Sequence, residues 1–143
     1  MTGWTAGAPR HRAALATYGD RLGMAFQIVD DLLDYTSDES VLGKPAGLDL
    51  REHKVTLPLL AVLPALTPGQ RDMVEEFFAD PEPEDDAIAA IIQLTHEHGG
   101  LDYAREQALA FAQRASAELE SLPEGPALQA LRESIVYAVE RSR

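Results

Sequence analysis

Apolar residues recur three to four positions apart along most of this chain, which is the period of a helix buried on one face. Stretches of alternating apolar and polar residues between hairpin turns, which would indicate strands, are missing from the sequence. The pattern therefore predicts an all-α protein of about six helices. The expected helices cover residues 10 or 12 to 35, 56 to 63 or 66, 67–79, 86–98, 101–122 and 126–141.

Residues that cap and stop helices support these boundaries. Thr67 to Gln70 reads TPGQ, with a threonine for the N-cap, a proline at the first helical position and a glutamine three residues after the cap. Gly99 and Gly100 are expected to end one helix. The polar, glycine-containing stretch 36–53 is expected to be a loop or a broken helix.

Composition narrows the class of protein. The chain has 143 residues, of which 45% are hydrophobic, enough for one domain with its own core. It contains no cysteine, which excludes disulfides and thiolate metal sites and fits a cytoplasmic protein. No apolar run reaches the roughly 18 residues of a membrane span, so we expect no transmembrane segment. The net charge of −12 argues against a nucleic-acid partner and favours cations.

The first expected helix has two distinct faces. At about 100° per residue, its apolar residues fall on one side and are expected to face a core. These are Leu22, Ala25, Phe26, Val29, Leu32 and Leu33. The polar residues gather on another face and comprise Gln27, Asp30, Asp31, Asp34 and Asp38.

Carboxylates spaced in this way repel one another by a few tenths of a kcal/mol for each pair. A divalent cation would reverse the sign of that interaction. Oxygen ligands without a nearby thiolate favour a hard ion, and Mg²⁺ typically takes one or two carboxylates while keeping water or phosphate oxygens. The alternative is a solvated acidic face in an acidic protein, and the acidic residues alone leave both interpretations open.

The two lysines lie close together in the sequence. Lys44 and Lys54 are the only lysines among twelve basic residues. Lys44 lies between Gly43 and Gly47, where the backbone can approach a polyanion closely. The alternative is a flexible surface loop that happens to contain a lysine. Taken together, the carboxylates and the lysines fit a clamp that holds a cation and a diphosphate.

Residues 23–60 carry three spaced motifs, GMAFQIVDDLLDY, GKPAGLD and KVTLP. They resemble the second aspartate-rich motif FQxxDDxxD, the GKxxGxD element and the KxTLP helix start of trans-type isoprenyl diphosphate synthases. That family makes geranylgeranyl and longer polyprenyl diphosphates. The last residues, LRESIVYAVERSR, are similar to the closing helix of the family. The resemblance implies the C-terminal part of the isoprenyl synthase helical bundle, with residues 1–143 as its C-terminal half.

The resemblance also implies a metal site. Asp30 and Asp34 would bind Mg²⁺ directly or through water. Asp31 would belong to the same metal site, and Gln27 would support it beside the substrate. The carboxylates would hold the metal electrostatically and would not act as general acids.

The implied substrates are an allylic prenyl diphosphate and isopentenyl diphosphate. Lys44 would bind the diphosphate of the allylic substrate, and Lys54 would make a further contact in the diphosphate site. Mg²⁺ and lysine would stabilise the departing diphosphate, and the allylic cation would then alkylate the double bond of isopentenyl diphosphate.

The family's first aspartate-rich motif and its upstream Gly-Gly-Lys segment are not found in these 143 residues. We therefore expect a prenyltransferase piece that is inactive or nearly so by itself. We also expect it to form a homo-oligomer or a complex with the missing N-terminal half. The alternative is a non-catalytic partner subunit of a heteromeric prenyl diphosphate synthase. A class I terpene cyclase is disfavoured, because its second metal-binding triad is not found downstream.

Overall fold

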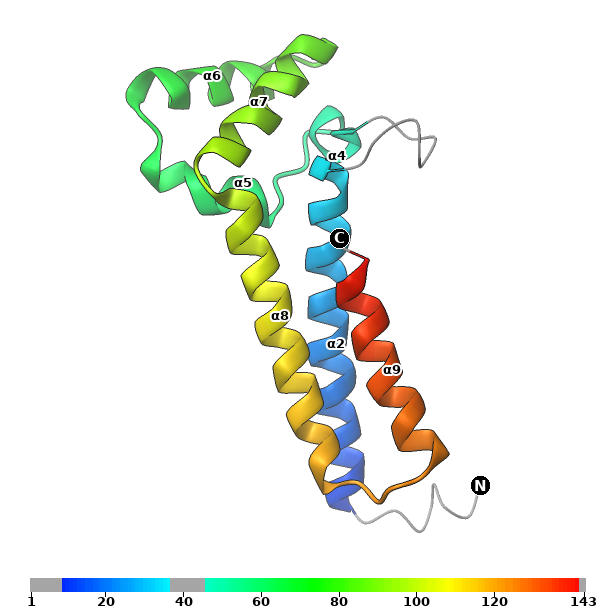
Figure 1. Cartoon of the computed structure of the whole chain (residues 1–143). Helices are drawn as coiled ribbons and strands as arrows, with labels where there is room; N and C mark the ends of the chain where they lie inside the picture. Colours follow the sequence, from blue (N-terminus) through cyan, green and yellow to red (C-terminus); the bar gives the residue numbers. More distant parts are fainter. Residues whose placement is uncertain (1–8, 37–45, 142–143) are drawn as a thin grey trace. The chain divides into compact units, whose positions relative to one another are not determined.

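The computed structural model describes residues 9–36 and 46–141, and this part of the chain contains helices and no strand (Figure 1). The all-α class is therefore confirmed. Lys44 and Asp38 lie outside the described residues. The α-helices are α2 (Pro9–Thr36), α4 (Leu48–Arg51), α5 (Leu57–Val62), α6 (Pro68–Ala79), α7 (Asp85–Glu97), α8 (Gly100–Glu118) and α9 (Pro126–Glu140). Short 3₁₀ helices, η1 (Leu63–Ala65) and η2 (Leu119–Ser121), follow α5 and α8.

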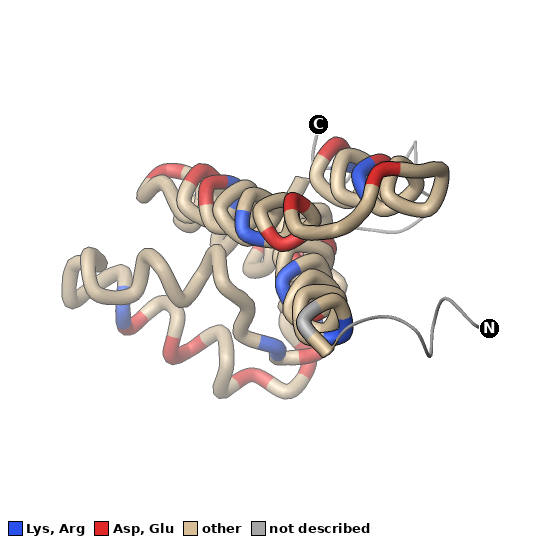
Figure 2. Tube along the Cα trace, turned by 90° about the horizontal axis from the view of Figure 1, so that it is seen from below, with Lys and Arg blue, Asp and Glu red and all other residues tan. Residues whose placement is uncertain are grey.

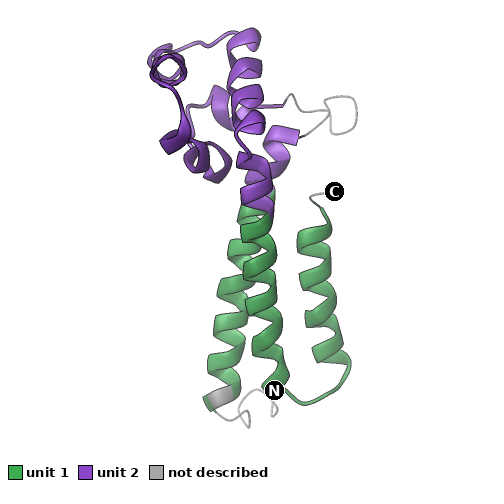
Figure 3. Cartoon of the chain, turned by 60° about the vertical axis from the view of Figure 1, so that its left-hand side comes forward, with its two compact units in different colours: residues 1–29, 106–143 green, residues 30–105 purple. Residues whose placement is uncertain are grey.

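The chain divides into two compact units (Figure 3). Unit 1 comprises Met1–Val29 and Glu106–Arg143, and unit 2 comprises Asp30–Arg105. Helices α2 and α8 each contribute to both units. The acidic triplet Asp30, Asp31 and Asp34, predicted from the sequence as a metal site, falls in unit 2.

Unit 1 packs the first part of α2, the second part of α8 and all of α9 side by side (Figures 1 and 3). Small residues on α8 allow the helices to approach closely, and a buried tyrosine links two of them. The Tyr18 hydroxyl on α2 donates a hydrogen bond of 3.0 Å to the carbonyl oxygen of Leu131 on α9. The buried core of this unit comprises Tyr18, Ala25, Ala112, Ala115, Leu119, Leu128 and Ile135.

The predicted apolar face of α2 is largely confirmed. Ala25, Val29 and Leu32 are fully buried. The prediction for Phe26 is wrong, because its side chain is 44% exposed. Its ring lies at the edge of the apolar arc and is covered on one side by the Arg141 guanidinium, whose carbon is 3.9 Å from the ring centroid. The same guanidinium donates a 3.3 Å hydrogen bond to the Phe26 carbonyl oxygen.

Helix α6 in unit 2 begins as the sequence predicts. Thr67 Oγ1 accepts a 3.2 Å hydrogen bond from the Gln70 N–H, and Gln70 Oε1 accepts one of 2.9 Å from the Thr67 N–H. This reciprocal pair forms a capping box. Phe77 of α6 is buried and packs edge to face against Phe78 and His53.

Helix α5 lies directly against the junction of α7 and α8, and Gly100 makes this possible. A Cβ atom at Gly100 would overlap the Pro58 carbonyl oxygen. It would also lie 2.8 Å from Thr95 Cγ2 and 2.9 Å from Val62 Cγ1. The position of α5 is therefore set by direct contact between its backbone and the backbone of Gly100, which has no side chain to keep the two apart.

Acidic residues occur along several helices rather than in a single patch (Figure 2). The sequence holds 24 acidic and 12 basic residues, so like-charge repulsion is spread over the surface. Among the described residues, no helix is both long enough and apolar enough to cross a membrane.

Candidate functional site

The last turns of α2 carry the predicted carboxylates. Asp30 is exposed, and Asp31 and Asp34 are half-buried. Gln27 is exposed and lies one turn before the triplet on the same helix. The spacing of these residues on one helix is therefore as the sequence predicts.

Asp34 is held by three consecutive backbone N–H groups. Its Oδ1 atom accepts a 3.0 Å hydrogen bond from the Leu48 N–H, and its Oδ2 atom accepts one of 3.1 Å from the Asp49 N–H. Its carbonyl oxygen accepts a third, of 2.9 Å, from the Gly47 N–H. These bonds join the end of α2 to the start of α4, across the stretch that contains Lys44.

The local sequence explains why the backbone can present these groups. Gly47 has a φ of 79°, a left-handed conformation that residues other than glycine rarely adopt. A Cβ atom at this position would also overlap Ile88 Cγ2 of α7. Gly47 therefore lets the chain turn toward Asp34 and lets α4 lie close to α7.

The environment of Asp34 disfavours its negative charge. Burial raises the pKa of the Asp34 carboxyl above its ordinary value, and the charges of Asp49 and Asp31 raise it further. The two backbone hydrogen bonds lower this pKa but do not cancel the effect of burial. A cation next to Asp34 would therefore relieve an unfavourable charge.

Asp49 was not among the residues predicted for the site, although it is the last residue of the GKPAGLD motif. Its N–H donates a hydrogen bond to the Asp34 carboxylate, and its own carboxylate Oδ1 lies 3.7 Å from Lys54 Nζ. Lys54 Nζ also lies 2.8 Å from Glu52 Oε2, and these carboxylates raise the pKa of Lys54. The structure thus brings Asp34, Asp49 and Lys54 into one connected group within unit 2.

The donor set is incomplete as a metal cage. Among the residues that the structure describes, no three His, Asp or Glu side chains are arranged to hold a metal ion by themselves.

Behind Asp34, the next residue on α2 is a buried tyrosine. Tyr35 is 4% exposed, and burial raises the pKa of its hydroxyl to about 12. Interactions with the Thr56 and Thr95 hydroxyls act in the opposite direction and lower this pKa. Tyr35 therefore stays neutral at physiological pH.

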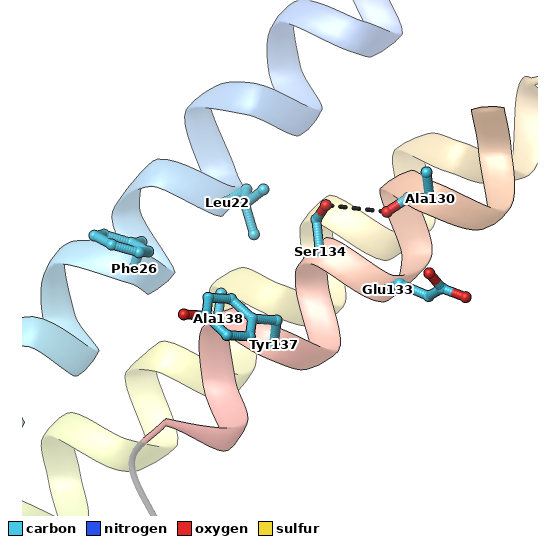
Figure 4. Close-up of a pocket in the computed structure, with 7 residues that line it drawn as sticks. All are labelled: Leu22, Phe26, Ala130, Glu133, Ser134, Tyr137 and Ala138. Atoms are coloured by element: carbon cyan, nitrogen blue, oxygen red, sulfur yellow. Dashed lines mark hydrogen bonds between the residues drawn. The ribbon is translucent and has the colours of Figure 1, made fainter.

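Unit 1 contains a separate pocket of about 390 Å³ between α2 and α9 (Figure 4). Its lining is mostly apolar, and the Ser134 hydroxyl donates a 3.0 Å hydrogen bond to the carbonyl oxygen of Ala130 within α9. The pocket is lined by Leu22, Phe26, Ala130, Glu133, Ser134, Tyr137 and Ala138.

Comparison with known proteins identifies the family. The family model described as polyprenyl synthetase matches residues 1–95, which is well over half of the chain. The chain belongs to the polyprenyl synthetase family. An all-trans-nonaprenyl-diphosphate synthase (geranyl-diphosphate specific) of Rhodobacter capsulatus is 39% identical over 136 residues, covering 95% of this chain and 41% of that protein.

Solved structures of the polyprenyl synthetase family show the same fold. A decaprenyl diphosphate synthase of Rhodobacter capsulatus superposes with a TM-score of 0.87 at 36% identity, over 99% of this chain and 44% of that chain. A polyprenyl synthase of Caulobacter crescentus, complexed with calcium and isoprenyl diphosphate, gives a TM-score of 0.81 at 37% identity. This match covers 92% of the present chain and 39% of the Caulobacter chain. The chain thus spans about two-fifths of the length of these relatives.

Proposed function

We propose that this chain is the C-terminal half of a polyprenyl diphosphate synthase, a prenyltransferase of isoprenoid biosynthesis. The enzyme would condense an allylic diphosphate with isopentenyl diphosphate to give geranylgeranyl or a longer polyprenyl diphosphate. The observation that carries this proposal is the connected group of Asp34, Asp49 and Lys54 at the motifs typical of the family. The family match supports the same function.

The residues present fit a magnesium ion. Oxygen donors on Asp30, Asp31 and Asp34 suit a hard cation, and the raised pKa of Asp34 means that a cation would relieve its charge. Bound magnesium would stabilise the negative charge that develops on the departing diphosphate. The relative from Caulobacter crescentus was solved with calcium, which is consistent with a divalent ion.

The proposal gives a role to each residue of the candidate site. Asp34, fixed by the N–H groups of α4, would keep the acidic group in place. Lys54 would offer its ammonium to the diphosphate in exchange for its bonds to Glu52 and Asp49. Gln27 would help to bind the substrate, and Lys44, which lies outside the described residues, would bind the diphosphate of the allylic substrate.

The remaining features of the proposal concern the whole protein. Inactivity of the chain alone is expected because it spans about two-fifths of its relatives and holds one aspartate-rich motif. A homo-oligomer, or a complex with the half that carries the first motif, and a cytoplasmic location stay predictions. The short span also fits the alternative, a non-catalytic partner subunit of a heteromeric synthase, although such a subunit has little need of intact FQxxDDxxD and GK motifs.

Calorimetric titration of the full chain with pyrophosphate, with and without Mg²⁺, tests the site. We expect magnesium-dependent binding that Asp34→Asn and Asp30→Asn each weaken by about tenfold or more, as loss of a metal ligand or its support does. Asp72→Asn, an exposed position on α6, is the matched control and should leave the affinity unchanged. Equal affinities for all these variants would contradict the proposal.

A chimera tests the activity. This chain would replace the matching region of the Rhodobacter capsulatus nonaprenyl diphosphate synthase, and elongation of labelled isopentenyl diphosphate would be measured with allylic primers. We expect activity in the chimera, loss of it with Asp34→Asn, and little or no elongation by the chain alone. Robust elongation by the isolated chain would overturn the claim that it needs a second half.

A further inference from the structure

The residue before Lys54 has a strained backbone. Among the residues that the structure describes, His53 is the only one other than glycine with a positive φ, which is 60°. Glycine adopts this left-handed conformation readily and asparagine sometimes does, whereas most other residues rarely adopt it. Such strain persists only where the surrounding structure imposes it, and it is frequent at functional sites. His53 therefore needs contacts that hold it in this conformation.

The left-handed residue completes the end of α4. Glu52 is the C-cap of this helix, and His53 follows it. The His53 N–H donates a 2.9 Å hydrogen bond to the Leu50 carbonyl oxygen. The Lys54 N–H donates one of 2.8 Å to the Asp49 carbonyl oxygen. These two bonds form a Schellman motif, which has a left-handed residue at the position of His53. The backbone position of Lys54 therefore depends on the conformation of His53.

The same turn connects Lys54 to the carboxylate of the candidate metal site. The Asp49 N–H donates a 3.1 Å hydrogen bond to Asp34 Oδ2, and the Asp49 carbonyl oxygen accepts the bond from Lys54. A single residue thus joins the Asp34 carboxylate to the backbone of Lys54. A different conformation of His53 would break the bond between Lys54 and Asp49, and it would change where the ammonium lies relative to Asp34.

Two aromatic side chains at the end of α6 hold the ring of His53. Its centroid lies 6.1 Å from that of Phe77, at an interplanar angle of 87°, and 6.0 Å from that of Phe78, at 55°. These separations are typical of favourable ring pairs. Phe77 is buried and packs edge to face against Phe78, so the two rings form a fixed surface. His53 Nε2 is buried without a hydrogen-bond partner among the described residues, so packing, and not a bond from this nitrogen, anchors the ring.

We propose that His53 is a positioning residue for Lys54. The aromatic pair fixes the ring, the fixed ring holds the left-handed turn, and the turn holds Lys54 where its ammonium meets the diphosphate beside Asp34. Glycine would form the same turn without strain but would leave it freer to rearrange. The anchored histidine sets the position of the lysine before the ligand binds, which reduces the ordering cost of binding. The inference rests on the proposed function, because it concerns the same diphosphate site.

Calorimetric titration of the full chain with inorganic pyrophosphate in the presence of Mg²⁺ tests the inference. His53→Asn removes the ring and keeps a residue that tolerates the left-handed turn, and it should weaken binding about fivefold through lost preorganisation. His98→Asn is the matched control, because it makes the same change at the C-cap of α7, where φ is −90°. It should leave the affinity unchanged. Far-UV circular dichroism at the titration temperature checks that each variant is folded.

A double-mutant cycle with Lys54 separates positioning from general packing. Lys54→Gln removes the ammonium and should itself weaken binding. In the Lys54→Gln background, His53→Asn should cause no further loss, because no ammonium remains to be positioned. A histidine that only stabilised unit 2 would act equally in both backgrounds. An equal loss in both backgrounds would therefore overturn the inference.

The outcomes also separate this inference from the proposed function. Full affinity in His53→Asn, with binding still weakened in Asp34→Asn, would overturn the inference and leave the proposed function intact. Full affinity in Lys54→Gln would overturn it as well, because the lysine would then make no contact that needs positioning. Unchanged binding in Asp34→Asn would instead count against the proposed function. If His53→Asn fails to fold, His53→Gly replaces it with the same expected loss, because glycine takes this turn without strain and also lacks the ring.

Discussion

Asp34 combines a structural and a chemical role in one side chain. Its two carboxylate oxygens accept hydrogen bonds from the N–H groups of Leu48 and Asp49 and so help to hold α4 in place. Burial and neighbouring carboxylates nevertheless disfavour its charge. The residue therefore holds its loop at some cost in stability, a cost that a bound cation would remove.

This cost predicts a pH dependence. Because the pKa of Asp34 is higher in the folded state, the folded protein holds more protons between pH 3.8 and that raised value. The free energy of unfolding contributed by Asp34 therefore falls as pH rises through this window. The difference in unfolding free energy between the original chain and Asp34→Asn, measured by urea unfolding across the window, should therefore fall as pH rises. An identical pH profile for both proteins, after subtraction of a constant, would contradict the raised pKa.

Single residues also show where sequence patterns fail. The position of Phe26 on the helical wheel predicts a core residue, but a wheel cannot show that Arg141, 115 positions later in the chain, covers only one face of the ring. Asp49 was missed for a similar reason. Its motif gave a signal, but its link to Asp34 depends on the turn at Gly47.

At the scale of elements, the sequence predicted most of the structure. Helix α6 starts at the predicted cap, and α2 and α9 begin and end within a few residues of the expected limits. These elements are set by local signals, namely helical periodicity, capping residues and glycine stops. Helix α4 was left open as a loop or a broken helix, because its four residues are held by Asp34 and α7 rather than by their own sequence.

The dependence of α4 on Gly47 gives a prediction at this scale. Gly47→Ala should lower the free energy of unfolding by roughly 1–3 kcal/mol, because alanine disfavours a φ of 79° and its Cβ meets Ile88. Gly69→Ala, in the first turn of α6 with open space around it, should change stability by less than about 1 kcal/mol. Urea denaturation of the two variants checks the contrast. Equal stability of the two variants would show that α4 does not need this turn.

At the scale of the whole molecule, charge and exposed apolar surface oppose each other. The net charge of −12 repels a second copy of the chain. Large apolar side chains are nevertheless exposed side by side: Tyr137, at 68%, and Phe26, at 44%, both line the mostly apolar pocket of unit 1. Exposed apolar surface of this kind favours association.

We therefore predict that the chain self-associates at micromolar concentration and that added salt strengthens the association. Screening shortens the range of the repulsion between like charges but leaves apolar contacts intact. Light scattering at low and at moderate sodium chloride measures the effect. A monomer of constant mass at both salt concentrations would refute the prediction.

The contact at Gly100 restricts which amino acids this position can hold. Any side chain there would overlap the Pro58 carbonyl oxygen, and backbone cannot rotate away as a side chain can. Gly125, by contrast, has open space around its Cβ position and tolerates replacement. A homologous chain that carries even alanine at the equivalent of Gly100 must therefore dock α5 differently. The lysine that precedes α5, the equivalent of Lys54, would then occupy a different position in the site.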